Sequence, residues 1–391
     1  MLEKKLNIAL LGIVTLPIPP FKGYGGTQRG IYDFLTHMDE KDHHVHLFGP
    51  GDSDVSKFGN VTLHSFIEQS LWVPENNLPI KTKKAQEKEH YQKSLERLGE
   101  IIRSEDVDII NLRSDDVDFL REVANRFGTE KIVYSLHNLR DQSRIDAIRD
   151  LGITSVAHCR NHKKQHGNLP NIKIITYGIN VETYPFSQNT ISQSTEILTL
   201  DVLKKLKRRG SDYLITIGNI GKNKGQKTCI ELARKADIPL IIAGAPQIRE
   251  SDERGTYFEE EIMAHVDGEN IIYFGNADEE QKKELLRHSR GFLFPSGYED
   301  KTWNEPFGRA PIEALSCGTP VIAYRKGSMP EIVFDSFNGF LFETKNEAVK
   351  QISSLDGINR EDCRRTAVKK FNSERVANEY EKLFYEILEN R

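Results

Sequence analysis

Short, continuous apolar runs recur along the chain and alternate with stretches of helical spacing. The first run spans residues 6–14, and others of strand length follow at 45–48, 107–112, 132–136, 153–157 and 172–176. A strand that is apolar on both faces is typical of a parallel sheet covered by helices. Between the first two runs, Ile31, Phe34, Leu35 and Met38 have the spacing of one buried helical face. The first half therefore predicts a doubly wound α/β domain with right-handed crossovers.

The same alternation resumes in the second half, with apolar runs at 213–217, 240–243, 271–274, 292–294 and 320–324. Between the two series the pattern weakens, and a polar stretch is followed by five basic residues: Lys204, Lys205, Lys207, Arg208 and Arg209. We interpret these as a solvated linker or helix face, with a membrane-surface or phosphate patch as the alternative. The predicted boundaries are 1–185 and 211–372 for two domains, 186–210 for a linker region, and 373–391 for a final amphipathic helix.

Composition excludes several classes of protein. The 54 Lys and Arg residues against 58 Asp and Glu leave a net charge of only −4, so the bulk charge does not indicate a nucleic-acid partner. Four scattered cysteines (Cys159, Cys229, Cys317 and Cys363) form no C-x-x-C pair, which argues against a disulfide scaffold or a thiolate zinc site. The apolar run at 6–14 is too short to span a membrane. The expected location is cytoplasmic, with peripheral membrane association left open.

Two glutamates in the second half are the clearest indication of a ligand-binding site. Seven residues separate Glu305 from Glu313, and Pro306 and Gly308 lie between them. Pro and Gly at a helix start place Glu305 in a loop and Glu313 in the body of the helix, about two turns beyond Glu305. The backbone N–H groups of Phe307 and Gly308 are then helix-start donors, suited to an anion or to sugar hydroxyls.

With its neighbouring motifs, this segment resembles the retaining glycosyltransferases of the GT-B fold, family four (the group 1 glycosyl transferases). Glu305 to Glu313 matches the E-x7-E motif of that family. The loop around Gly25 and Gly26 resembles a subgroup whose loop reads Y-G-G-T-E. Other matches, in chain order, are Y-G-I-N-V at 177–181, I-G-N-I-G-K-N-K-G at 217–225, I-A-G at 242–244, F-P-S at 294–296 and G-S-M-P-E-I-V at 327–333. The resemblance covers nearly the whole chain.

The resemblance implies an architecture of two Rossmann-like domains that face a cleft, with the last helix crossing back to the N-terminal domain. The N-terminal domain would face the acceptor, and the C-terminal domain would hold a nucleotide-sugar donor. The implied activity is that of a hexosyltransferase that keeps the anomeric configuration, by a same-face mechanism without a metal ion. No cofactor is implied, and a UDP-sugar is favoured over a GDP-sugar. The acceptor is left open among a glycan, a lipid and a small molecule.

Several site residues are implied by position. Gly25 and Gly26 would approach the donor diphosphate, which agrees with the close backbone approach that glycine permits. Lys224 would pair with phosphate, but Asn219 stands where the family has a partner arginine, with Lys222 or Arg29 as possible replacements.

The remaining site residues contact the sugar and the nucleoside. His137, directly after a buried strand, would lie near the reacting sugar. Glu313 would bind the ribose hydroxyls, and Glu305 would hold the transferred sugar together with the amides of Phe307 and Gly308.

Two alternative functions stay open, and two alternative kinds of site are disfavoured. A non-transferring enzyme of the same fold, such as a nucleotide-sugar epimerase or hydrolase, stays open, as does a catalytically silent binding protein. A dinucleotide-binding loop is disfavoured because about ten residues separate the first strand from the glycines. Three D-x-D runs could suggest a metal site, and we interpret them as loop and cap residues: Asp52-Ser-Asp54, Asp106-Val-Asp108 and Asp116-Val-Asp118.

Overall fold

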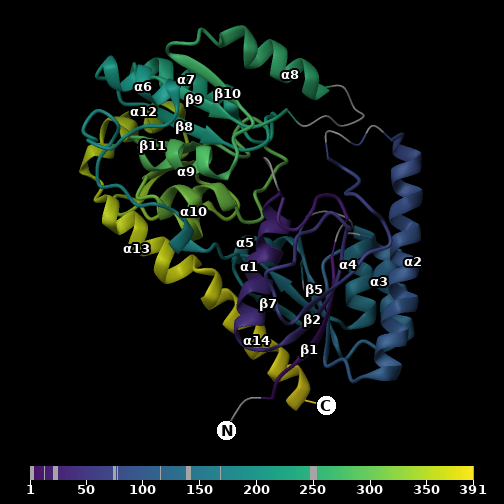
Figure 1. Cartoon of the computed structure of the whole chain (residues 1–391). Helices are drawn as coiled ribbons and strands as arrows, with labels where there is room; N and C mark the ends of the chain where they lie inside the picture. The colour runs from purple at the N-terminus through teal and green to yellow at the C-terminus, as the bar shows by residue number, and fades with distance from the viewer. Residues whose placement is uncertain are drawn as a thin grey trace. The chain divides into compact units, whose positions relative to one another are not determined.

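The computed structural model describes residues 4–390, other than 13, 21–24, 74, 75, 77, 115, 138–141, 168 and 247–252, and of residues 253–256 it describes the backbone only. Two compact units divide the chain (Figure 1). Of the described residues, those in 4–20, 25–178 and 373–390 form the first unit, and those in 179–372 form the second.

In the described part of the first unit, seven parallel strands form one sheet in the order β3-β2-β1-β4-β5-β6-β7. Its strands are β1 (Asn7–Leu11), β2 (His44–Phe48), β3 (Val61–His64), β4 (Ile109–Leu112), β5 (Ile132–Ser135), β6 (Thr154–Ala157) and β7 (Ile172–Ile174). Its helices are α1 (Gly26–Glu40), α2 (Ile80–Ser104), α3 (Val117–Phe127), α4 (Gln142–Leu151), α5 (Arg160–Gln165) and α14 (Ser373–Glu389).

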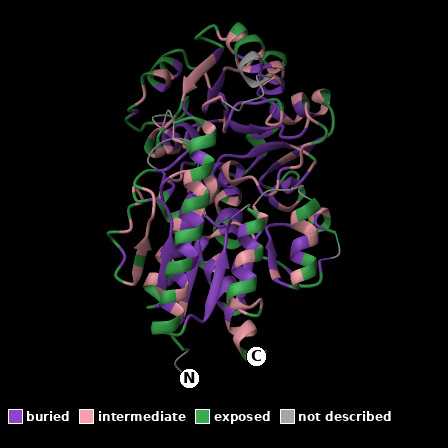
Figure 2. Ribbon diagram, turned by 90° about the vertical axis from the view of Figure 1, so that its right-hand side faces the viewer, coloured by how far each residue is buried: buried purple, intermediate pink, exposed green. Residues whose placement is uncertain are grey.

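Helices cover both faces of this sheet, which explains its continuous apolar strands. One buried cluster joins the strands to α2 and α3 through Leu95, Leu98 and Leu120. The other joins them to α1 and α14, where the rings of Phe34 and Tyr380 meet edge to face at 5.7 Å. Figure 2 shows the buried strands between helices whose outer faces are exposed. The final helix thus returns to the first unit because its apolar stripe completes that core.

In the described part of the second unit, six parallel strands form a sheet in the order β10-β9-β8-β11-β12-β13. They are β8 (Leu214–Ile217), β9 (Leu240–Ala243), β10 (Ile271–Gly275), β11 (Gly291–Phe294), β12 (Val321–Tyr324) and β13 (Gly339–Phe342). The α-helices are α6 (Asp201–Arg208), α7 (Gln226–Ala236), α8 (Glu253–Glu261), α9 (Glu279–Arg287), α10 (Arg309–Ser316), α11 (Met329–Ile332), α12 (Lys345–Ser353) and α13 (Arg360–Phe371). Short 3₁₀ helices lie at Val181–Thr183, Met263–His265 and Leu355–Gly357.

The two doubly wound sheets confirm the predicted α/β class. The segment 186–210, expected as a linker, is bonded into the second unit: Ser187 N–H donates to Cys317 O, and Ile191 N–H donates to His288 O. The basic cluster lies on and just after α6, whose Leu203 and Leu206 are buried, so these cations occupy the solvated side of an amphipathic helix. Among the described residues, no helix is long and apolar enough to cross a membrane.

Candidate active site

The order of strands in the second sheet places two loops beside each other. The chain runs from β8 outward to β9 and β10, and then returns to the other side of β8 as β11. The loops after β8 and β11 therefore flank the point where the strand order reverses, which is where open α/β sheets bind ligands. Lys224 lies in the first of these loops, and Glu305 lies in the second.

A buried ion pair joins the two loops. Lys224 Nζ lies 2.5 Å from Glu305 Oε2, and the side chains are only 17% and 10% exposed. Ser296 Oγ donates to the same carboxylate oxygen at 2.8 Å, and Trp303 Nε1 lies 3.4 Å from it. The ammonium also lies 5.1 Å from the centre of the Trp303 ring. The sequence motifs predicted roles for Lys224 and Glu305 but not for Ser296 or Trp303, although Ser296 ends the F-P-S motif and Trp303 lies two residues before Glu305.

These donors control the protonation of Glu305. Burial alone would raise the pKa of this carboxyl group, but the charge of Lys224 and the hydrogen bonds from Lys224, Ser296 and Trp303 outweigh it, and the pKa is lowered. All of these hydrogen bonds reach Oε2. Within the described residues, no protein group donates a hydrogen bond to Oε1, so the second oxygen is left to accept one from a ligand.

Two glycines allow the backbone to pack closely around this pair. Gly225 has φ +80°, and a Cβ there would meet Pro295 O at 2.9 Å. Gly327 has φ +62°, and a Cβ would meet Glu305 O at 2.7 Å. Side chains at these positions would push apart the loops that position Lys224 and Glu305.

The start of α10 also has the predicted form. Gly308 is the N-cap in the left-handed region (φ 85°), and its backbone N–H and that of Phe307 belong to the turn that opens the helix. Phe307 is buried, and Ser328 Oγ donates to its carbonyl oxygen. The turn is therefore held by protein contacts and is positioned to present a helix N-terminus.

Glu313 lies inside α10 and is only 4% exposed. Its Oε1 lies 3.2 Å from Arg309 Nε, and its Oε2 lies 3.0 Å from Lys282 Nζ on α9. Two cations thus compensate one buried carboxylate. Arg309, four residues before Glu313, could have been anticipated from helical spacing, whereas Lys282 carries no signal in the sequence.

Asn219 holds the family position of an arginine and is buried in the loop after β8. Its carbonyl oxygen accepts a hydrogen bond from Gln226 Nε2 at 2.9 Å, and Gln226 Oε1 accepts one from the Gly221 N–H at 3.2 Å. Gln226 therefore fixes the path of the loop that leads to Lys224. Lys222, one proposed replacement for the missing arginine, is exposed.

His137 lies in the first unit, two residues beyond β5. Its Nδ1 is hydrogen-bonded to Tyr177 Oη, and its ring stacks on that of His158 at 5.6 Å. Its Nε2 is buried and has no hydrogen-bond partner in the described part of the chain. Burial, followed by the proximity of His158 and Arg113, lowers the pKa of His137 well below its usual value, so the imidazole is neutral. Residues 138–141, which follow it, lie outside the described residues.

Gly25 and Gly26 open α1, after the strand β1 that borders the reversal point of the first sheet. Gly25 O accepts the hydrogen bond of Arg29 N–H at 2.9 Å. A Cβ on Gly25 would meet Pro20 Cγ at 2.4 Å, so only glycine fits here without displacing the loop. Residues 21–24 of this loop lie outside the described residues.

The D-x-D runs make ordinary loop and cap contacts. Asp116 caps α3 by accepting from Phe119 N–H, and Asp52 accepts from Ser70 N–H and Oγ. Asp54 accepts from Ser56 N–H, and Asp108 pairs with Lys4. Among the described residues, no group of three or more His, Cys, Asp or Glu side chains is placed to hold a metal ion.

Known proteins resemble this chain in sequence and in fold. Residues 201–370, which contain Lys224, Glu305 and Glu313, match the family described as "Glycosyl transferases group 1". The sucrose-phosphate synthase of Thermosynechococcus elongatus superposes with a TM-score of 0.76, at 17% identity, over 99% of this chain and 100% of that one. Anabaena HepE, solved with UDP and glucose, superposes with a TM-score of 0.68, at 16% identity, over 97% and 100%. The two-domain fold is therefore the GT-B fold, as predicted.

Curated relatives match more locally. The N-acetyl-alpha-D-glucosaminyl L-malate synthase of Bacillus anthracis is 27% identical over 187 residues, which are 45% of this chain and 45% of that protein. An uncharacterized 41.2 kDa protein from the cps region of Klebsiella pneumoniae is 25% identical over 214 residues, 51% of this chain and 56% of that protein. The chain thus spans about half the length of the curated relatives it matches.

Proposed function

We propose that the protein is a retaining glycosyltransferase that moves a sugar from a nucleoside-diphosphate sugar to an acceptor hydroxyl. The observation that carries this proposal is the buried pair of Lys224 and Glu305 at the reversal point of the second sheet. A cation and a hydrogen-bond acceptor side by side suit a ligand that joins a diphosphate to a sugar. In this proposal the second unit, which includes residues 186–210, binds the donor.

The proposed roles follow the contacts. Lys224 pairs with the diphosphate. When Lys224 leaves Glu305, the negative charge of the diphosphate replaces that of the carboxylate as its counter-ion. Glu305 Oε2 stays bonded to Ser296, so Oε1 accepts a hydrogen bond from a sugar hydroxyl. The N-terminus of α10, at Phe307 and Gly308, faces the anionic part of the donor, and Asn219 belongs to the donor-binding loop. Glu313 binds the ribose hydroxyls while Lys282 and Arg309 compensate its negative charge.

Transfer then needs stabilisation of the leaving group. As the bond between the anomeric carbon and the diphosphate oxygen breaks, negative charge grows on the diphosphate, where Lys224 is already fixed. The acceptor oxygen attacks from the face that the diphosphate leaves, and its proton passes to the departing phosphate oxygen. In this proposal His137, Gly25 and Gly26 position the donor from the first unit, and no metal ion takes part.

The donor is proposed to be a UDP-sugar. HepE, a structural neighbour, was solved with UDP and glucose. A panel of nucleotide sugars in a thermal-shift assay tests this, because a ligand at 100 times its Kd stabilises the folded state by about 2.7 kcal/mol. Stabilisation by GDP-sugars alone would contradict the UDP preference.

Release of nucleoside diphosphate tests the activity itself. A transferase releases it faster when an acceptor is present, a hydrolase releases it equally without acceptor, and a silent binding protein releases none. The configuration of the product, read by NMR at early times, tests the mechanism, and an inverted product would contradict it.

A further inference from the structure

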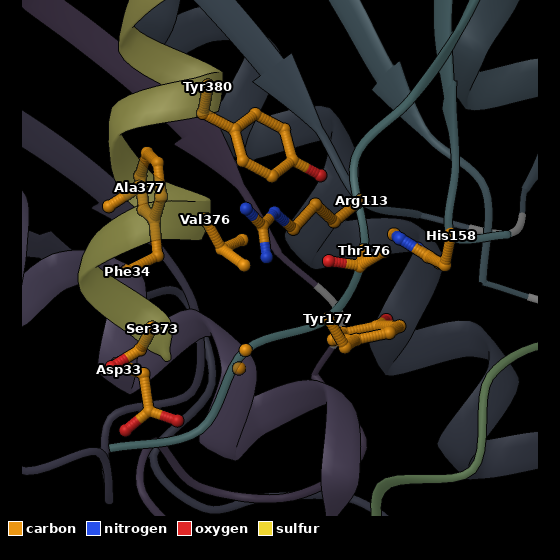
Figure 3. Close-up of a pocket in the computed structure, with 12 residues that line it drawn as sticks. Asp33, Phe34, Arg113, His158, Thr176, Tyr177, Ser373, Val376, Ala377 and Tyr380 are labelled. Carbon is orange, nitrogen blue, oxygen red and sulfur yellow. The ribbon is translucent and has the colours of Figure 1, made fainter. Parts of the chain in front are cut away.

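A cavity outside the proposed donor site lies wholly within the first unit. It is lined by residues that directly follow three strands and by residues of α1 and α14 (Figure 3). The lining groups that matter here are Asp33, Arg113, His158, Thr176, Tyr177 and Tyr380. Arg113 follows β4, which borders β1 at the reversal point of this sheet, so the cavity occupies the usual ligand-binding edge.

The cavity is the size of one polar group. It leaves about 20 Å³ for the centres of water-sized molecules, and about 350 Å³ of empty space when its opening to solvent is included. A single water needs about 10–15 Å³ by the first measure. The interior therefore accommodates a carboxylate or the oxygens of a phosphate, and the rest of any ligand must lie towards the opening.

Arg113 supplies an uncompensated charge in this cavity. It is 3% exposed, and Figure 3 shows its guanidinium group pointing in among the other lining side chains. Nε donates to Asn111 Oδ1 at 2.8 Å, but Nη2 is buried without a hydrogen-bond partner, and within the described residues no carboxylate lies within salt-bridge distance. The Arg113 guanidinium carbon lies 5.1 Å from the centre of the Phe34 ring and 5.4 Å from the centre of the Tyr380 ring. These cation–π contacts offset only part of the free-energy cost of burying the charge. A buried guanidinium group with a nitrogen that has no hydrogen-bond partner favours the binding of an anion.

The surroundings define what kind of anion fits. His158 beside Arg113 carries no charge, because burial lowers its pKa to about 4, so Arg113 is the cation that faces the ligand. Asp33, half-buried on α1, lines the same cavity and would repel a second negative charge while accepting a hydrogen bond from a hydroxyl. Tyr177, another lining residue, is hydrogen-bonded to His137. The cavity therefore adjoins a residue that the proposed function places next to the reacting sugar.

We infer that Arg113 binds the carboxylate or phosphate group of a small acceptor, whose hydroxyl groups extend past Asp33 and Tyr177 towards the reacting centre. This inference rests on the proposed function and narrows its acceptor to a hydroxylated compound with one anionic group. The anion could also come from free phosphate, and the experiment below separates the two sources.

The binding test uses the full chain without donor. Calorimetry measures the affinity for glucose 6-phosphate, glucose, gluconate and inorganic phosphate in the parent and in Arg113→Met, Arg113→Lys and the control Arg121→Met, an exposed arginine of α3. Glucose 6-phosphate and gluconate should bind the parent at least tenfold more tightly than inorganic phosphate does, and glucose should not bind. Arg113→Met should weaken both by tenfold or more, Arg113→Lys by less, and Arg121→Met should change nothing. Binding of inorganic phosphate alone, or binding that Arg113→Met leaves intact, would overturn the inference.

A stability measurement separates a binding role from a structural one. Methionine fills the space between Phe34 and Tyr380 without a charge, so Arg113→Met should melt no lower than the parent when no anion is present. The stabilisation by glucose 6-phosphate should disappear. Two results together would assign Arg113 a structural role and overturn the inference. The first is that Arg113→Met unfolds in the absence of anion, and the second is that Arg113→Lys binds the anion fully and is as stable as the parent.

Turnover distinguishes failure of this inference from failure of the proposed function. Nucleoside diphosphate release that rises with an uncharged acceptor but not with an anionic one would overturn the anionic acceptor and leave the transferase intact. Arg113-dependent anion binding with no release from any nucleotide sugar would contradict the transferase and, with it, the acceptor role of the site.

Discussion

Lys224 and Glu305 are 81 residues apart in the chain, yet their side chains meet in a buried ion pair 2.5 Å long. The pair forms because β8 and β11 are neighbours in the sheet, so that the loops that follow them converge. Ser296 and Trp303 add donors to the same carboxylate oxygen. A carboxylate with so many donors stays ionised in a buried place, and its second oxygen remains available to a ligand.

Replacement of Glu305 by Gln should impair both chemistry and stability. Turnover with the full donor should fall by about 10²-fold, in the range of a lost oriented polar group. Binding of the bare nucleoside diphosphate, measured by calorimetry, should change little, because no sugar is present. The free energy of unfolding should fall by about 3–5 kcal/mol, since Lys224 loses its buried partner. Unchanged turnover in a folded Glu305→Gln protein would remove this residue from the site, and the exposed Glu343→Gln is the matched control.

In contrast to Glu305→Gln, Glu313→Gln should impair the binding of the nucleoside diphosphate. Binding of the nucleoside diphosphate itself should weaken by tenfold or more, because the ribose contact is lost. Stability should also fall, because Lys282 and Arg309 both lose their buried counter-ion. The double variant Lys282→Met with Glu313→Gln should recover part of the stability but none of the affinity. Parental affinity for nucleoside diphosphate in a folded Glu313→Gln protein would show that the ribose role is wrong.

The sequence predicted those parts of the fold that depend on periodicity. Fully apolar runs marked most strands of both sheets, and the stripe of α14 predicted a buried helix. The edge strand β3 was missed because its residues are only partly buried and its pattern is mixed. The short strand β13 was not predicted.

Residues of the site were predictable only where they belong to a local motif. Glu305, Gly308 and Glu313 share one loop and helix, so spacing alone relates them. Lys282, on α9, reaches Glu313 only through the packing of two helices, and Arg113 was not singled out because a lone arginine after a strand has no distinctive spacing. Such contacts depend on tertiary structure and produce no periodic pattern in the sequence.

Acid should destabilise the first unit through its buried histidines. Burial lowers the pKa of His90 to about 4, against about 6.5 in the unfolded chain. The unfolded state therefore binds a proton that the native state rejects, and stability is lost as the pH falls from about 6.5 to about 4. His90→Leu should reduce the slope of unfolding free energy against pH by up to about 1.4 kcal/mol per pH unit in denaturant titrations. An unchanged slope between pH 6.5 and pH 4 would contradict the neutral, buried state of His90.

Chelation should leave turnover largely intact. In the proposed mechanism, Lys224 and the helix N-terminus at Gly308 meet the charge of the leaving diphosphate. Nucleoside diphosphate release should therefore be the same, within about twofold, before and after dialysis against EDTA. Loss of activity that manganese or magnesium restores would contradict this, and alanine variants of Asp52, Asp106 and Asp116 would then locate the ion.

His137→Ala should lower turnover by about 10²-fold while leaving the fold intact. Retention requires either a nucleophile on the far face of the sugar or attack from the face that the diphosphate leaves. The neutral ring of His137, hydrogen-bonded to Tyr177, is suited to orienting a sugar hydroxyl through Nε2. Its pKa lies well below 6.5, so turnover of the parent should not decline between pH 8 and pH 6 through protonation of this ring.

Further variants in the same assays test whether His137 orients the sugar. His137→Asn, which keeps a polar group, should recover part of the turnover, and His44→Ala, on strand β2 of the same sheet, should retain all of it. Turnover that follows a pKa near 6.5 in the parent and loses that dependence in His137→Asn would show that the ring acts as a titrating acid or base. Full activity in a folded His137→Ala protein would remove the residue from the mechanism, because a group that orients the reacting sugar cannot be deleted without slowing the transfer.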